Sequence, residues 1–219
     1  MSGEGAAPQK VLVATTNPGK IREITAILDG APVALVTLAS FPDLVEPEET
    51  GATFMENARL KALYYAAATG LPSVADDSGL EIEALDNAPG VHSARWYGTD
   101  YAVKFRMIYQ LLRERGLDTS AARFVAAVAF AEDAGIRFEG RGVVQGEIAR
   151  EPAGTYGFGY DPIFYYPPYG CTLAQVDGDA KARVSHRGAA FRAFRDYLLN
   201  RDPRGFAPRT PLRRRSRGP

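Results

Sequence analysis

The stretch "VLVATTNPGKIREI", residues 11–24, constrains the fold most, because an apolar strand pattern runs through a short turn directly into a helical pattern. Asn17 is a favourable N-cap, and Pro18 suits the first position of a helix. Apolar residues then recur at helical spacing until Gly30 ends the pattern. A helix that begins at the end of a strand presents free N–H groups and its positive dipole end to a ligand. The segment therefore predicts a strand–turn–helix that is suited to binding an anion.

This segment does not match the Walker P-loop. That pattern requires glycine at position 14 and serine or threonine at position 21, where this chain has Ala14 and Ile21. The hydroxyl group that binds Mg²⁺ in a P-loop is thus missing, so a metal ion would have to be held elsewhere. Gly19 allows close approach to the backbone, and Lys20 adds a mobile charge. On this segment alone, an ordinary strand–turn–helix with a surface lysine explains the pattern equally well.

The order of the elements predicts an α/β (mixed α+β) fold, with a mixed sheet and helices packed on it. Strands alternate with helices early in the chain, and consecutive strands dominate later. Strand patterns cover residues 10–15, 33–38, 73–76, 123–131, 136–149 and 162–166, and helical patterns cover 18–29, 53–69, 101–115 and 186–200. Three glycines within 136–149 predict a bulge or a bent hairpin there.

Length and composition predict one folded region with two terminal segments. The 219 residues, 46% of them hydrophobic, suffice for one large domain or two small lobes. We expect a flexible N-terminus over 1–9, the folded domain over 10–200, and a basic disordered tail over 201–219. No apolar run is long enough to span a bilayer, and a single cysteine, Cys171, suits a reducing cytoplasm.

The charge distribution is uneven although the formal net charge is zero. The tail over 201–219 holds seven Arg and one Asp, which leaves 19 basic and 25 acidic residues in the remainder, a net charge of −6. A basic tail can bind nucleic acid or an acidic partner. The acidic remainder disfavours nucleic acid as a ligand of the folded domain, and a solvated appendage is the favoured explanation of the tail.

Carboxylates at the end of a predicted strand suggest a metal site. The apolar run at 73–76 leads into Asp76 and Asp77, whose side chains point to opposite sides of a strand. Mg²⁺ binds few protein carboxylates and completes its shell with water and substrate phosphates. Glu48 or Glu49 in the acidic loop "EPEETG" could complete such a site, although turn chemistry and a solvated loop also account for these acids.

The helix predicted over 53–69 begins with a T-x-x-E capping box formed by Thr53 and Glu56. Glu56 therefore has a structural explanation. Asn57 and Lys61 are four residues apart and share one helical face, which points either into a cleft or into solvent.

Two later segments have the composition of ligand-binding loops. "GTYGFGYDPIF", residues 154–164, combines three glycines with aromatic rings on which a base can stack. In the second segment, Ser185 can cap the last helix, and His186 and Arg187 then occupy a first turn where the dipole disfavours cations. Residues placed there against the dipole suggest a ligand, although exposed basic residues would show the same pattern. No G-x-S-x-G motif is present, so covalent catalysis is not expected.

Six motifs taken together resemble one protein family. They are, in order, T-x-N-x-G-K, E-E-T-G-x-T-F-x-E-N-A-x-x-K-A, A-D-D-S-G-L, A-P-G-V-x-S-A-R, G-F-G-Y-D-P-I-F and S-H-R-G-x-A. Each motif alone is weak, but the six in this order strongly resemble the inosine triphosphate pyrophosphatase family, which acts on non-standard purine nucleoside triphosphates. The resemblance covers about residues 10–200.

The resemblance implies a long mixed central sheet and two lobes with an active-site cleft between them. It implies a cytoplasmic homodimer that cleans the nucleotide pool by Mg²⁺-dependent hydrolysis of dITP, ITP, XTP or dXTP. Cleavage between the α and β phosphates would give the nucleoside monophosphate and pyrophosphate.

The resemblance also implies roles for individual residues. Asp77 matches the family's proton acceptor and metal-site acid, and Glu48 matches the second metal-linked acid. Glu56, Asn57 and Lys61 fall in a further motif with less defined roles. Thr16 departs from the Gly or Lys common at its position, and the tail is not part of the family pattern. The substrate contacts implied are Thr15, Thr16, Asn17, Pro18, Gly19, Lys20, Ser78, Phe158, Gly159, Tyr160, Asp161, Lys181, His186 and Arg187.

Two functions of other classes remain open at this point. A nucleotide sensor without catalysis would bind the same ligand, although the acidic pair argues against it. A nucleic-acid-binding protein acting through its tail is disfavoured by the net-acidic remainder of the chain.

Overall fold

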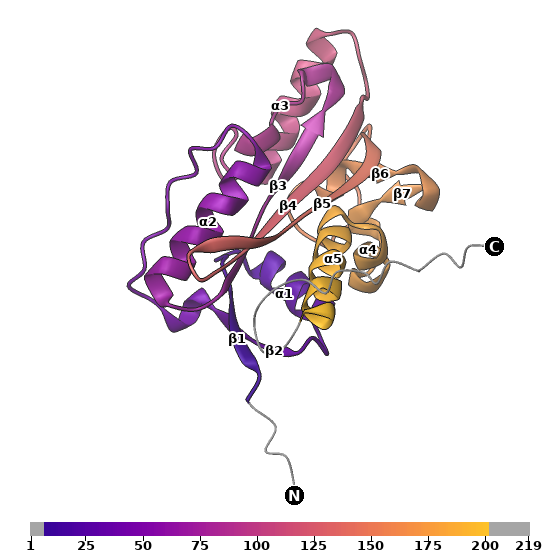
Figure 1. Cartoon of the computed structure of the whole chain (residues 1–219). Coiled ribbons are helices and arrows are strands. Elements are labelled where there is room, and N and C mark those ends of the chain that lie inside the picture. The colour runs from indigo at the N-terminus through magenta and orange to yellow at the C-terminus, as the bar shows by residue number, and fades with distance from the viewer. Residues whose placement is uncertain (1–6, 202–219) are drawn as a thin grey trace, which may run out of the picture.

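Seven strands form one curved mixed sheet within residues 7–201, the part of the chain that the computed structural model describes (Figure 1). Their order across the sheet is β2-β1-β3-β4-β5-β6-β7. β1 runs parallel to β2 and β3, and the other neighbouring pairs are antiparallel. The strands span β1 Gln9–Val13, β2 Val33–Thr37, β3 Ser73–Ile82, β4 Ala121–Glu132, β5 Gly135–Ile148, β6 Phe164–Tyr166 and β7 Cys171–Thr172.

Of the five α-helices within residues 7–201, four begin within one residue of the predicted start, and the helix Gly178–Val184 was not predicted. The side chain of Asn17 accepts hydrogen bonds from the backbone N–H groups of Gly19 and Lys20 at the start of α1. Thr53 and Glu56 form the expected capping box at the start of α2. The helices span α1 Pro18–Ile27, α2 Phe54–Thr69, α3 Tyr101–Glu114, α4 Gly178–Val184 and α5 His186–Asn200.

Helices cover both faces of the sheet, and the alternation of side chains along β1 shows how. Val11 and Val13 pack in one apolar cluster with residues of α1 and α5. Leu12, between them, packs on the opposite face in a cluster with residues of α2. A third cluster joins α3 to the far ends of β3, β4 and β5 and to β6. The mixed α/β fold expected from the sequence is confirmed.

The glycines of β5 serve close packing. A Cβ atom at Gly142 would lie 1.9 Å from the carbonyl oxygen of His186, so glycine there lets the start of α5 touch the sheet. The ladder between β4 and β5 does contain an irregularity, but it lies between Phe130 and Ala131, near the β4–β5 turn. The predicted bulge in this hairpin is thus present, whereas Gly142 has a packing role.

The structure corrects several strand predictions: the strand expected over 162–166 begins only at Phe164, and β7 was not predicted. The strand expected over 73–76 runs on to Ile82, and Ser78 and Gly79 pair with Ala126 and Val125 of β4. The Asp-Asp-Ser-Gly segment, which composition suggested was a turn, is therefore strand because β4 supplies a full-length partner.

The terminal segments fall partly outside the described residues. Residues 1–6 of the predicted flexible N-terminus lie outside them, and β1 already begins at Gln9. Of the predicted tail, Arg201 is described and 202–219 are not. Within residues 7–201, no helix has the length and apolar character that crossing a membrane requires.

Candidate active site

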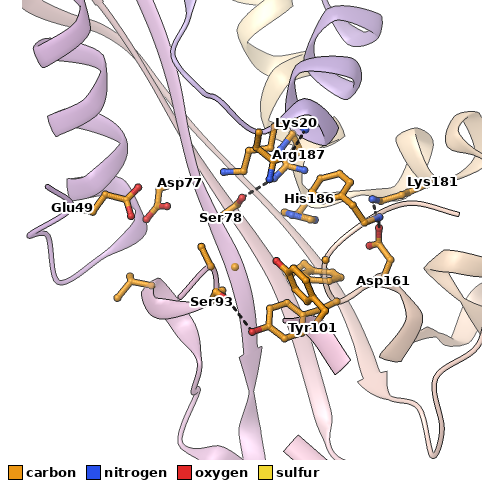
Figure 2. A pocket seen from close by; sticks show the side chains of 18 residues that line it. Lys20, Glu49, Asp77, Ser78, Ser93, Tyr101, Asp161, Lys181, His186 and Arg187 are labelled. Carbon is orange, nitrogen blue, oxygen red and sulfur yellow. Dashed lines mark hydrogen bonds and ion pairs between the residues drawn. The ribbon is translucent and has the colours of Figure 1, made fainter. Parts of the chain in front are cut away.

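Adjacent acids in the middle of β3, Asp76 and Asp77, mark the centre of the site. Both are nearly buried, with 2% and 6% of their surface exposed. Because successive side chains alternate along a strand, the two carboxylates face opposite sides of the sheet. Figure 2 shows Glu49 and Asp77 on one side of the pocket, and Asp161, Lys181 and His186 on the other.

Asp76 neutralises two cations, the buried Arg187 and the partly buried Lys20. Its Oδ2 lies 3.1 Å from Nζ of Lys20 and 3.2 Å from Nε of Arg187, and it accepts a hydrogen bond of 3.1 Å from the hydroxyl of Ser78. Burial alone would raise the pKa of Asp76, but Lys20 and Arg187 overcome that effect and hold its pKa below the ordinary value. Asp76 is therefore ionised, with all three partners on Oδ2, whereas its Oδ1 has no hydrogen-bond partner among the described residues.

Glu23 of α1 extends this network to the opposite wall, and the sequence did not single it out. Its two carboxylate oxygens bind Arg187 at 2.7 Å and Lys181 at 2.8 Å. Lys181 also pairs with Asp161 at 2.5 Å, and Asp161 accepts a 2.8 Å hydrogen bond from the backbone of Phe158. Glu23 follows Lys20 at an i, i+3 spacing, so its place on the same face of α1 was the available signal.

The other acid, Asp77, has a different set of neighbours. Asn57 donates to its Oδ2 at 3.1 Å, and Nζ of Lys61 lies 3.4 Å from its Oδ1. Lys61 also binds Glu49 at 2.6 Å, so one ammonium stands between two carboxylates. Burial raises the pKa of Asp77, and the nearby charge of Glu49 adds to that effect. The predicted face of Asn57 and Lys61 on α2 thus points into the site.

Of the two candidate acids in the loop before α2, the structure brings Glu49 to the pocket. Glu49 lines the pocket and pairs with Lys61, and Arg95 holds its other oxygen at 2.9 Å. Burial would raise the pKa of Glu49, but Lys61 and Arg95 lower it below its ordinary value. Glu48 is exposed and does not line the pocket. Glu56 binds backbone N–H groups at the start of its own helix, as its capping role requires.

The N-terminus of α1 opens into the same pocket. Asn17 and Lys20 line it, and burial lowers the pKa of Lys20. A Cβ atom at Gly19 would lie 2.7 Å from the ring of Phe158, so glycine allows this ring to cover the turn. The predicted neighbours contribute locally: Thr15 accepts from the backbone of Asn17, Thr16 bonds Glu46, and Pro18 opens the helix.

An aromatic end lies across the pocket from Glu49. It is lined by Phe124, Phe158, Gly159, Tyr160 and His186. The ring of His186 stacks on Phe124 with centroids 4.8 Å apart. Burial, together with Arg187 and Lys181, lowers the pKa of His186 well below its ordinary value, so the imidazole is neutral. Its Nδ1 is buried and has no hydrogen-bond partner among the described residues.

Comparisons with known proteins identify the family of this chain. A model of the Ham1 family matches residues 11–197. The chain belongs to the Ham1 family. The resemblance inferred from the six motifs is thereby confirmed, and it spans nearly all of the described residues.

Individual relatives match over almost their whole length. A dITP/XTP pyrophosphatase of Geobacter sulfurreducens is 45% identical over 192 residues, which cover 86% of this chain and 96% of the relative. A dITP/XTP pyrophosphatase of Thermus thermophilus is 50% identical over 186 residues, covering 84% and 89%. The structure of a HAM1 protein from Coxiella burnetii superimposes with a TM-score of 0.80 at 38% identity, covering 87% of this chain and 98% of that one.

The acids of this Ham1-family site fit a hard divalent cation of the kind the family generally needs. Lys61 already places a positive charge between Glu49 and Asp77, so both carboxylates can reach a shared cation. Within residues 7–201, no group of three or more His, Cys, Asp or Glu could form a complete protein cage. Two carboxylates with open positions match the way Mg²⁺ binds together with substrate phosphates.

Proposed function

We propose that this chain hydrolyses dITP, ITP, XTP and dXTP to the nucleoside monophosphate and pyrophosphate. The observation that carries the proposal is one pocket with two unlike ends. At one end of the pocket, Asp77 and Glu49 lie near Lys20 at the N-terminus of α1. At the other end lie His186 and the aromatic rings. The first end suits phosphates, and the second suits a purine base.

The phosphate end is built to neutralise and position a triphosphate, the main requirement of phosphoryl chemistry. The backbone N–H groups of the turn after Asn17 and the ammonium of Lys20 would bind phosphate oxygens. Glu49 and Asp77 would hold Mg²⁺, with Glu48 close by in sequence as the acid that the family motif implies. Bound there, Mg²⁺ would neutralise phosphate charge and lower the pKa of a coordinated water.

Asp77 is the candidate catalytic base. Asn57 and Lys61 fix both of its carboxylate oxygens, and burial raises its pKa toward the working range of a general base. We propose that Asp77 orients the attacking water and accepts its proton. Cleavage between the α and β phosphates then releases pyrophosphate.

The aromatic end would select the base through its 6-oxo group. Deamination of adenine replaces a 6-amino donor by a 6-oxo acceptor, so a pocket with a donor there rejects ATP. His186 supplies a neutral imidazole that lines the pocket, whereas Arg187 is already held by Asp76, Glu23 and Ser78. We infer that Arg187 and Lys181 mainly shape the site. Removing Arg187 would leave the carboxylates of Asp76 and Glu23 without this partner.

The test is a panel of nucleoside triphosphates assayed for pyrophosphate and orthophosphate with and without Mg²⁺. We expect pyrophosphate from ITP, dITP and XTP, little product from ATP, and no product without a divalent ion. Tight binding of ITP without hydrolysis would instead identify a nucleotide sensor. Loss of activity, or of salt-dependent DNA binding, on deletion of 201–219 would reveal a role for the tail. The homodimer and the cytoplasmic location are part of the proposal, and gel filtration and cell fractionation test them.

A further inference from the structure

One buried cation takes no part in the chemistry proposed above. Lys104 of α3 has no exposed surface, and its Nζ donates to the carbonyl oxygens of Ser93 at 3.0 Å and Ala94 at 2.7 Å. The same atom lies 4.3 Å from the centre of the Tyr101 ring and 5.7 Å from that of Tyr160. None of the ion pairs within residues 7–201 includes Lys104.

Burying a lysine that has no carboxylate partner costs free energy, because the ammonium group loses its contact with water. Burial lowers the pKa of Lys104, which reflects the cost of keeping its charge away from water. An apolar side chain of similar volume would pack on α3 without that cost. The role of the ammonium group therefore lies in its contacts, which are two backbone carbonyl groups and the faces of two tyrosine rings.

Those two carbonyls belong to a segment that forms one wall of the pocket. The Ser93 carbonyl accepts a second hydrogen bond, 2.9 Å long, from the hydroxyl of Tyr160. The Ser93 hydroxyl oxygen accepts from the backbone of Leu80 at 2.9 Å. A Cβ atom at Gly79 would lie 2.3 Å from this hydroxyl, so the segment presses on β3 two residues beyond Asp77.

We propose that Lys104 is a positioning residue that sets the base selectivity of the pocket. Ser93, Ala94, Tyr101 and Tyr160 all line the pocket, and Lys104 contacts every one of them from behind. Figure 2 shows Ser93 and Tyr101 along the side opposite Lys20 and Arg187. Displacing such a wall by about 1 Å weakens discrimination strongly, because selectivity depends on the fit of the base. This inference rests on the proposed function, since it assumes a purine in the pocket.

The test compares Lys104→Met, which keeps an unbranched side chain one atom shorter and removes the donors, with Lys104→Gln, which keeps a polar end. We expect Lys104→Met to raise KM for ITP about tenfold and to lower the ITP-to-ATP ratio of kcat/KM about tenfold, with kcat within about threefold. Lys104→Gln keeps an N–H donor and should bring the ratio back to within about threefold of the wild type. Arg106→Met, at an exposed position of the same helix, is the matched control and should change neither value.

Equilibrium binding of inosine and adenosine monophosphates to each variant measures the same selectivity without catalysis. A wild-type protein that releases no pyrophosphate would refute the proposed function, whereas the binding ratio would still test Lys104. A folded Lys104→Met protein with lower thermal stability but unchanged ITP-to-ATP and monophosphate ratios would overturn the inference. If that variant does not fold, Tyr160→Phe removes the other donor to Ser93. An unchanged ITP-to-ATP ratio of kcat/KM in Tyr160→Phe would then also overturn the inference.

Discussion

Asp76 and Asp77 are neighbours on β3, yet the two faces of the sheet give them opposite electrostatic surroundings. On the Asp76 face, Lys20 and Arg187 converge on one carboxylate oxygen and hold its pKa low. On the Asp77 face, burial dominates and raises the pKa, and Glu49 lies nearby. One acid is thus committed to holding buried cations in place, and the other keeps the capacity to bind a metal ion or a proton.

The largest expected effect is on turnover at Asp77. Asp77→Asn retains the shape of the side chain but removes its charge and its basicity, so kcat should fall by about 10²- to 10⁴-fold. Pyrophosphate release from ITP measures the loss, and circular dichroism and thermal unfolding establish that the variant is folded. Near-normal turnover would refute the catalytic assignment.

The matching change on the other face should act on stability. Asp76→Asn leaves the partly buried Lys20 and the buried Arg187 without their shared carboxylate, so the free energy of unfolding should fall by about 3–5 kcal/mol. Urea denaturation of Asp76→Asn and Asp77→Asn side by side measures the contrast. Equal losses of stability in the two variants would contradict the division between the faces.

A smaller effect separates the two glutamates before α2. Glu49→Gln removes an acid that lines the pocket, so the Mg²⁺ concentration for half-maximal activity should rise at least about tenfold. Glu48→Gln, one residue away and exposed, is the matched control and should leave it nearly unchanged. If Glu48→Gln raised this Mg²⁺ concentration and Glu49→Gln did not, the metal-binding role would belong to Glu48.

The smallest effect concerns the pH dependence of stability at His186. The folded protein keeps His186 neutral well below its ordinary pKa of 6.5, whereas the unfolded chain takes up the proton near that pH. The stabilising contribution is therefore complete above pH 6.5 and is lost as the pH falls toward the folded-state pKa. The free energy of unfolding of the wild type should fall by about 1 kcal/mol more than that of His186→Asn between pH 7 and 5.5. Parallel curves would show that folding does not lower the pKa of His186.

Features that depend on neighbours in sequence could be predicted. The capped start of α1 follows from Asn17 and Pro18, and the start of α2 follows from Thr53 and Glu56, because each cap closes within three residues. The full length of β3 could not be predicted in the same way. Its second half is held by β4, which follows only after α3 in the chain, as the pairing of Ser78 with Ala126 shows.

The sequence alone determined the mixed α/β class, the two capped helices, the neighbouring carboxylates and the ordered motifs. Each of these features depends on residues that lie a few positions apart in the chain. Only the tertiary structure decided that Glu49 faces the pocket, that Glu23 links Lys181 to Arg187, and that Lys104 supports the wall at Ser93. The physical reason is that each of these depends on packing between distant elements. Glu23 and Arg187, for example, are 164 residues apart in the chain and 2.7 Å apart in space.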